Sequence, residues 1–124
     1  MASHRPKHLN PFKIRLPLPG AVSLLHRISG ALLFMAIPLF LLTFQATLYS
    51  AESFDKVRQE FGNPLVKLVL ISLLWGFLHH FFAGLRFLSM DAHLGLDLHE
   101  SRRNSLLVLA FSLALTILTG IWLW

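Results

Sequence analysis

Three long apolar stretches dominate the chain, and short polar segments separate them. Residues Ile28 to Leu48 and Ser105 to Trp124 carry no charged side chain, and residues Leu68 to Leu85 contain no Asp, Glu, Lys or Arg. Each stretch approaches or reaches the ~20 residues that an α-helix needs to cross a bilayer. The pattern therefore predicts an all-α integral membrane protein with three transmembrane helices.

Local signals set the expected ends of these helices. The first helix is expected to begin near Ala21, after Pro17 and Pro19, and the second opens at Asn63-Pro64, an N-cap followed by a first-turn proline. We predict one membrane-anchor domain over residues 1–124, with an N-terminal segment 1–20 and helices over about 21–48, 64–90 and 104–124. Pro38 lies within the first span, where it either bends the helix around a bulky group or is one of the prolines common in membrane helices.

Composition narrows the class of protein further. Of the residues, 55% are hydrophobic and 14% are charged, whereas soluble domains carry about 25% charged residues. This balance excludes a water-soluble monomer. The chain has no cysteine, so it cannot itself hold a disulfide, a thiolate zinc site or an iron–sulfur cluster. Its net charge of +5 is scattered around the spans, which argues against a nucleic-acid partner and for a role in membrane orientation.

Positive charge predicts how the chain is oriented. Eight basic residues lie in the N-terminal flank and the second loop region, namely Arg5, Lys7, Lys13, Arg15, Arg27, Arg86, Arg102 and Arg103, against Lys56, Arg58 and Lys67 on the other side. The positive-inside rule therefore predicts a cytoplasmic N-terminus and a periplasmic C-terminus. No signal peptide or long transit peptide is recognisable, so we expect a lipid partner in the form of a bacterial inner membrane.

A polar face is expected at the start of the first helix. Ser23, His26, Arg27 and Gly30 fall within a wedge of about 100° on a helical projection. Ser23 and Arg27 are able to donate to a carbonyl oxygen or an anion, and Gly30 allows a flat ring to approach. Alternatively, Arg27 extends to lipid phosphate and Ser23 caps the helix.

A second polar stripe lies on the second predicted helix. His80, Gly84, Phe87 and Asp91 share one azimuth, and His80 lies about 16 Å along the axis from Asp91, near the expected bilayer midplane. An imidazole there suits a haem ligand or a proton carrier, or it bonds a carbonyl across a helix interface. His79 points about 100° away and cannot bind the same iron. Four histidines lie outside the spans and are expected in solvent or among lipid head groups: His4, His8, His93 and His99.

Two motifs resemble those of the cytochrome b556 membrane-anchor subunits of succinate dehydrogenase, in respiratory complex II. Residues Ser23 to Gly30 fit the pattern S-x-x-H-R-x-(S/T)-G, and residues His80 to Asp91 fit H-x-x-x-G-x-R-H-x-x-x-D except at one position. Arg5-Pro6 near the start also fits, so the resemblance covers nearly the whole chain. The exception is Phe87, which replaces a histidine, so no role of that histidine transfers to this chain.

The resemblance implies a role for each matching residue. His80 is expected to be an axial ligand of haem b, His26 to lie near the haem propionates, and Arg86 to belong to the cofactor site. Ser23 and Arg27 are expected to bind ubiquinone. Asp91 is a candidate proton relay, or alternatively a helix-end cap or ion-pair partner.

The resemblance also implies partners. A second anchor subunit would supply the other axial histidine, and a flavoprotein and an iron–sulfur subunit would carry electrons from succinate to quinone. The chain would then be a non-flavin subunit of an enzyme, without a complete active site of its own. Two alternatives remain, namely a haem-free structural anchor and the anchor of a fumarate reductase.

Overall fold

The computed structural model describes residues 16–124, which form four helices: α1 (Leu18–Tyr49), α2 (Ala51–Phe61), α3 (Pro64–Asp91) and α4 (Leu98–Leu123). The described part of the chain is therefore all-α, as predicted. Several residues used above lie outside it, namely His4, Arg5, Pro6, Lys7, His8, Lys13 and Arg15.

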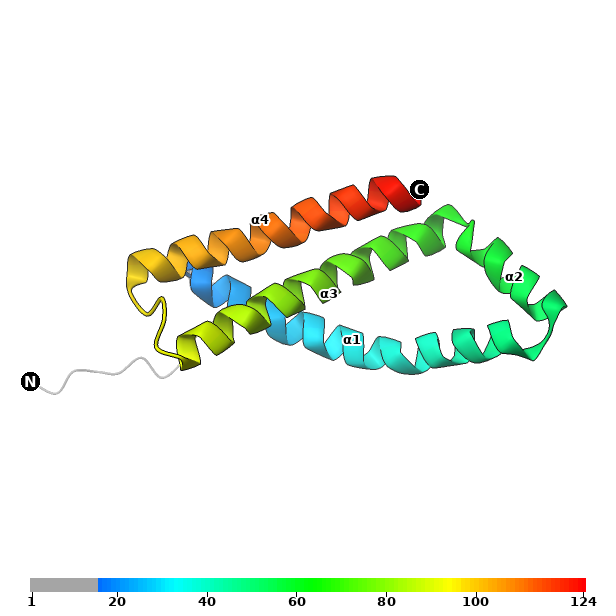
Figure 1. Ribbon diagram of the computed structural model, residues 1–124, viewed down its shortest axis with the longest axis horizontal. Coiled ribbons are helices and arrows are strands. Elements are labelled where there is room, and N and C mark those ends of the chain that lie inside the picture. The colour runs from blue at the N-terminus through cyan, green and yellow to red at the C-terminus, as the bar shows by residue number, and fades with distance from the viewer. Residues whose placement is uncertain (1–15) are drawn as a thin grey trace, which may run out of the picture.

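Three of the helices, α1, α3 and α4, are long and apolar enough to cross a membrane, which confirms the predicted number of spans in residues 16–124. They contain 32, 28 and 26 residues. At about 1.5 Å per residue, each exceeds the roughly 30 Å of a hydrocarbon core. In Figure 1 the three helices run alongside one another, and α3 contacts both α1 and α4. Helix α2 connects the C-terminal end of α1 to the N-terminal end of α3.

The helix ends differ from the expected ones for identifiable reasons. Helix α1 begins at Leu18 because Pro19 occupies its first turn, where the missing N–H costs no hydrogen bond. Helix α4 begins at Leu98, and its first turns carry Glu100 and a pair of arginines. Charged residues were expected to precede this helix, but they are compatible with a helix end that lies outside the hydrocarbon.

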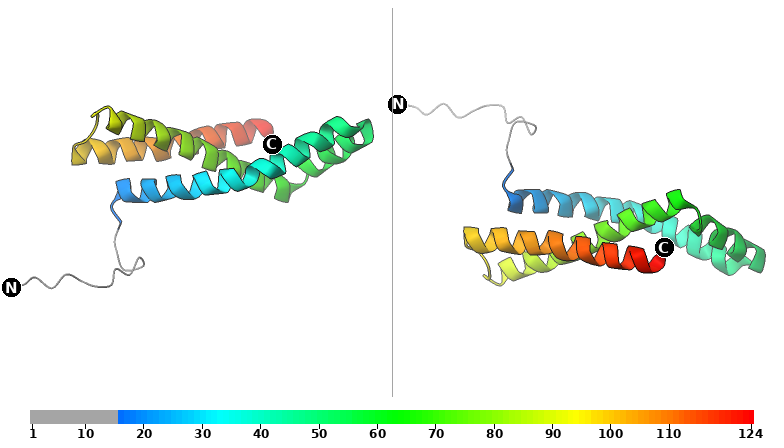
Figure 2. Two further views of the ribbon diagram at one scale, coloured as in Figure 1. Left: turned by 90° about the horizontal axis from the view of Figure 1, so that it is seen from below. Right: turned by 90° about the horizontal axis from the view of Figure 1, so that it is seen from above.

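The sequence pattern gave no expectation of α2. Its 11 residues are mostly polar, and the Ser50 hydroxyl caps its start by accepting from the Ser53 backbone N–H at 3.1 Å. Helix α1 continues through Pro38 and changes direction part-way along, as the two views of Figure 2 show. Proline is the expected cause, because it removes one backbone hydrogen bond.

The interior between the spans is small and contains many polar side chains. Its apolar cluster consists of Val22, Ala83 and Val108, with Phe82 and Leu109 packed against it. The buried polar residues are Ser29, His79, Arg86, Ser105, Ser112 and Thr116. Most large apolar side chains of the spans face outward. Small and hydroxyl residues inside, with large apolar residues outside, are typical of helices that associate in lipid.

Candidate functional site

Two histidine rings from different helices are stacked at the centre of the site. His26 on α1 and His80 on α3 have ring centroids 4.1 Å apart and planes that differ by 8°. His80 Nδ1 lies 3.0 Å from the backbone carbonyl oxygen of His26 and 3.3 Å from Ser29 Oγ. The Ser29 hydroxyl also donates to the His26 carbonyl, at 3.0 Å. The first sequence motif and the second therefore meet in space.

These contacts indicate which nitrogen of His80 carries the proton. A carbonyl oxygen only accepts, so the 3.0 Å contact is a hydrogen bond only when Nδ1 of His80 is the donor. A neutral imidazole with its proton on Nδ1 has a free lone pair on Nε2. The sequence analysis offered a hydrogen bond across a helix interface as one role of His80, and the structure contains that bond. The same bond leaves the Nε2 lone pair without a proton, so Nε2 is able to bind a metal.

A glycine makes room for the His80 ring. A Cβ added to Gly30 would lie 2.8 Å from His80 Cε1 and 3.3 Å from its Nδ1. No real side chain fits that space unless the imidazole moves. The fit explains why the first motif ends in glycine, because α1 must approach α3 closely at this level.

Phe87, the residue that departs from the second motif, packs against the other ring. Its centroid lies 5.1 Å from that of His26, with the planes tilted by 51°. An apolar ring therefore occupies this position beside the stacked histidines. Gly84 lies on the same side of α3, where an added Cβ would be 3.8 Å from His26 Nε2, an ordinary contact.

Ser23 and Arg27 lie on α1 close to the stacked pair in sequence. Ser23 is partly buried and Arg27 is exposed. Within residues 16–124 neither side chain has a hydrogen-bond or ion-pair partner.

Arg86 and Asp91 lie away from the stacked histidines. Arg86 is buried, its Nη2 donates to Ser101 Oγ on α4 at 2.9 Å, and its Nε has no partner in the described part of the chain. The guanidinium thus faces α4, whereas the His80 ring faces α1. Asp91 is the exposed last residue of α3, and no ion pair joins it to another described residue.

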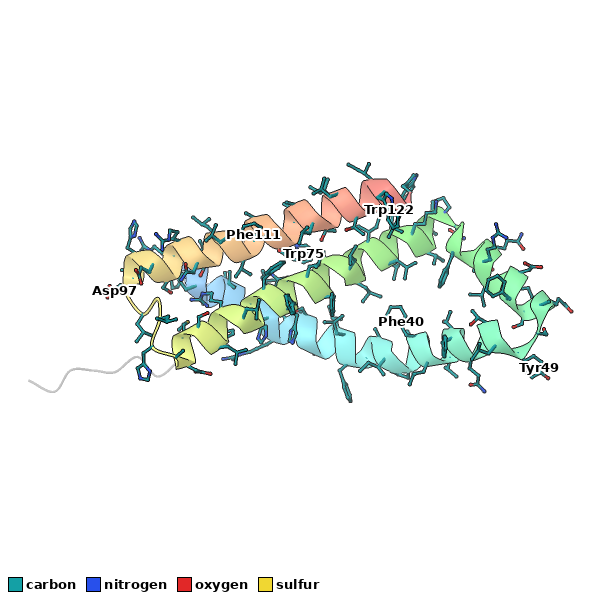
Figure 3. The ribbon with its side chains drawn as sticks, viewed as in Figure 1. Phe40, Tyr49, Trp75, Asp97, Phe111 and Trp122 are labelled. Atoms are coloured by element: carbon teal, nitrogen blue, oxygen red, sulfur yellow. The ribbon has the colours of Figure 1, made fainter. Side chains whose placement is uncertain are left out.

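Sequence reasoning gave His79 no role, and the structure places it in the interior. Its side chain is 1% exposed, and neither ring nitrogen has a hydrogen-bond partner among residues 16–124. Its ring lies 5.6 Å from that of Trp75, which Figure 3 labels on α3. The signal available in the sequence was its spacing of four residues from Ala83 and seven from Arg86, because residues at these spacings share one helix face.

His79 also lines a groove of about 740 Å³ between α1, α3 and α4. Most of the lining is apolar, and Ser29, Ser72 and Thr116 add hydroxyl groups. Ser29 connects this groove to the stacked histidines, because its hydroxyl lies 3.3 Å from His80 Nδ1 and donates to the His26 carbonyl. The groove therefore adjoins the stacked pair.

No group of three or more His, Asp or Glu side chains among residues 16–124 is arranged to hold a metal ion.

Comparison with known proteins identifies the family of this chain. The family model described as "Succinate dehydrogenase/Fumarate reductase transmembrane subunit" matches residues 1–119. A succinate dehydrogenase cytochrome b556 subunit from Coxiella burnetii is 34% identical over 125 residues, covering all of both chains. A protein of the same name from Paracoccus denitrificans is 31% identical over 105 residues, covering 85% of this chain and 81% of its own. With its three membrane-spanning helices, this chain belongs to the family of succinate dehydrogenase and fumarate reductase transmembrane subunits.

Proposed function

We propose that this chain is a haem b-binding anchor subunit of succinate:quinone oxidoreductase, with His80 as an axial ligand of the iron. The observation that carries the proposal is the hydrogen bond from His80 Nδ1 to the His26 carbonyl, because it leaves Nε2 free. Such a bond to the second nitrogen is the usual partner of a metal-bound imidazole. The names of the two cytochrome b556 relatives support the same cofactor. Bound haem would supply one-electron transfer.

The second axial ligand is proposed to come from a sister anchor subunit. Neither His26, whose ring is stacked on that of His80, nor His79, which is buried in the interior, is assigned this role. As the resemblance to the cytochrome b556 anchors implies, the haem would be held between two chains.

The surroundings of the haem are assigned to two more residues. His26 is proposed to lie near the propionates, since its ring is in contact with that of His80. Arg86 remains a predicted cofactor residue. Its Nη2 donates to Ser101 on α4, and the other N–H groups of the guanidinium, Nε among them, are the donors that a propionate would use.

Ser23 and Arg27 are proposed to bind ubiquinone near the cytoplasmic surface. The Ser23 hydroxyl would donate to a quinone carbonyl oxygen, and the Arg27 guanidinium would stabilise negative charge that develops there during reduction. Donors aimed at a developing oxyanion favour the reduced form over the neutral quinone. Protons would arrive from water, with the exposed Asp91 carboxylate as a proposed relay.

The quinone assignment has a direct test. Ser23→Ala and Arg27→Leu are expected to lower succinate:quinone activity, while succinate oxidation with an artificial dye acceptor is retained. The dye takes electrons before the membrane site, so it reports on assembly. An equal loss of both activities would mean that the variants fail to assemble, and unchanged quinone activity would remove these residues from the site.

The haem assignment is tested by replacing the proposed ligand. In the purified complex, His80→Leu is expected to lose the b-type signal in pyridine-haemochrome and dithionite-reduced spectra. His99→Leu is the control, because His99 is exposed on α4 and away from the stacked pair. An unchanged spectrum in His80→Leu would move the ligand elsewhere. If the wild-type complex also lacks the signal, the chain is a haem-free anchor.

The partners and location follow from the same proposal. The chain would anchor the flavoprotein and iron–sulfur subunits at the cytoplasmic side of a bacterial inner membrane, with its N-terminus on that side and its C-terminus in the periplasm. The excess of basic residues in the N-terminal flank and the α3–α4 region supports this direction. The matched family also contains fumarate reductase anchors, but both relatives reported above are succinate dehydrogenase subunits. Reporter fusions at each terminus would test the orientation.

A further inference from the structure

Helix α2 has two chemically different sides. Phe54, Val57 and Phe61 lie within about 60° of one another on a helical projection. The side chains of Phe54 and Phe61 are 50% and 44% exposed, so this chain alone does not cover them. The other side carries charged and amide groups, including an ion pair of 2.7 Å between Lys56 and Glu52.

One end of the apolar stripe, Phe61, is turned toward the membrane-spanning part of the molecule. Phe61 lines a groove of about 400 Å³ together with Leu70 and Leu74 of α3. These leucines follow Pro64 by six and ten residues, which places them about 9 and 15 Å along the α3 axis. The Phe61 side chain therefore reaches back toward residues that lie inside the predicted span.

We propose that α2 lies in the plane of the membrane interface and inserts Phe54, Val57 and Phe61 into the boundary between lipid head groups and acyl chains. Eleven residues give a helix of about 16 Å, which is too short to cross a bilayer. Both of its ends connect within a few residues to spans, α1 at Tyr49 and α3 at Pro64. Phe61 joins the stripe to the apolar surface of α3 through the groove that it shares with Leu70 and Leu74.

The charges of α2 indicate whether anionic lipids are needed to hold this helix at the interface. The helix carries three acidic residues, Glu52, Asp55 and Glu60, and two basic residues, Lys56 and Arg58. A helix held by anionic lipid has an excess of Lys and Arg on its polar face. Helix α2 is therefore held by burial of its apolar stripe and needs no anionic lipid.

The experiment uses single cysteines in the assembled complex. This chain has no cysteine of its own, so labelling of its band on a denaturing gel reports only the introduced thiol. Phe54→Cys on the stripe is compared with its neighbour Asp55→Cys on the polar side, and Val57→Cys with Gln59→Cys. Permeabilised membranes are treated with a charged, water-soluble maleimide or with a lipid-soluble one. Dye-linked succinate oxidation in the same membranes shows that each variant assembles.

The rate with the lipid-soluble reagent is divided by the rate with the charged reagent at each position, which cancels the reactivity of the thiol itself. We expect this ratio to be about tenfold higher at Phe54→Cys than at Asp55→Cys, and about tenfold higher at Val57→Cys than at Gln59→Cys. Added salt is expected to leave these differences unchanged. Equal ratios would place the stripe in water and overturn the proposal. Protection of Phe54→Cys and Val57→Cys from both reagents until denaturation would also overturn it, because a protein partner would then cover the stripe.

Discussion

Replacing Gly30 by alanine is expected to weaken haem binding without weakening α1. The new Cβ would lie 2.8 Å from His80 Cε1, whereas carbon atoms in good contact are about 3.5–4.0 Å apart. The imidazole must therefore move by about 1 Å. Metal-ligand distances tolerate about 0.2 Å, so this displacement cannot leave Nε2 where the iron requires it.

The surroundings of His80 determine how large the effect is. The ring cannot move freely, because it is stacked on His26 and bonded to that residue's carbonyl. Changes to groups that hold a metal ligand typically cost about 10–100-fold in metal affinity, and we expect a loss of that size. Alanine favours a helix over glycine by about 1 kcal/mol in soluble hosts, so a weakened α1 would not explain it.

The assay is haem content per assembled complex, measured by pyridine haemochrome, together with the reduced-minus-oxidised spectrum. Gly76→Ala is the matched control, because its Cβ would meet only Ser29 Cβ, at 4.0 Å. The control is expected to keep full haem. If Gly30→Ala also keeps full haem and the wild-type spectrum, the close contact does not constrain the ligand and the reasoning is refuted.

Three further variants test the packing around the site. Ser29→Ala removes a hydroxyl that lies 3.3 Å from His80 Nδ1 and is expected to shift the haem midpoint potential. Ser29→Thr keeps a hydroxyl and should keep the wild-type potential. Identical potentials in the wild type and both variants would contradict this. His79→Leu is expected to retain haem, because the His79 ring is not part of the stacked pair and no contact with His80 Nδ1 depends on it; loss of the b-type spectrum would contradict this. Ser101→Ala removes the hydrogen bond to Arg86 and should lower stability by about 1.5–3 kcal/mol in thermal unfolding of the complex, and an unchanged melting temperature would mean that another group holds the guanidinium.

Much of the fold follows from composition, because three uncharged stretches of sufficient length have few alternatives to membrane helices. The helix ends were less predictable. The arginines near the start of α4 suggested a loop, yet a helix extends through them because charge at a helix end outside lipid costs little. Helix α2 was not predicted because the prediction rested on long uncharged runs, whereas the apolar residues of α2 form only a stripe along 11 mostly polar residues.

The candidate site shows a similar division. The motifs placed Ser23, His26 and His80 on helices, and one-dimensional spacing showed which residues share a face. That His26 and His80 stack is a property of how α1 crosses α3, and 54 residues separate them. His79 and His80 are neighbours in the sequence, but His80 is stacked on His26 and His79 is buried in the interior. The sequence alone does not reveal this difference, because it depends on how the helices pack.

The buried hydroxyls of α4 have a consequence for how the protein is made. Ser105, Ser112 and Thr116 each donate to a carbonyl of their own helix, at 2.7, 3.1 and 2.7 Å. Helix α4 therefore satisfies these donors before it meets any neighbour, and it is able to leave the translocation machinery for lipid by itself. Helix α3 brings Arg86 into the same interface, where its Nη2 donates to Ser101 Oγ of α4 and not to a group of α3. Membrane insertion of α3 is thus expected to depend on α4 emerging soon after it, which makes the third span a folding partner of the second during synthesis.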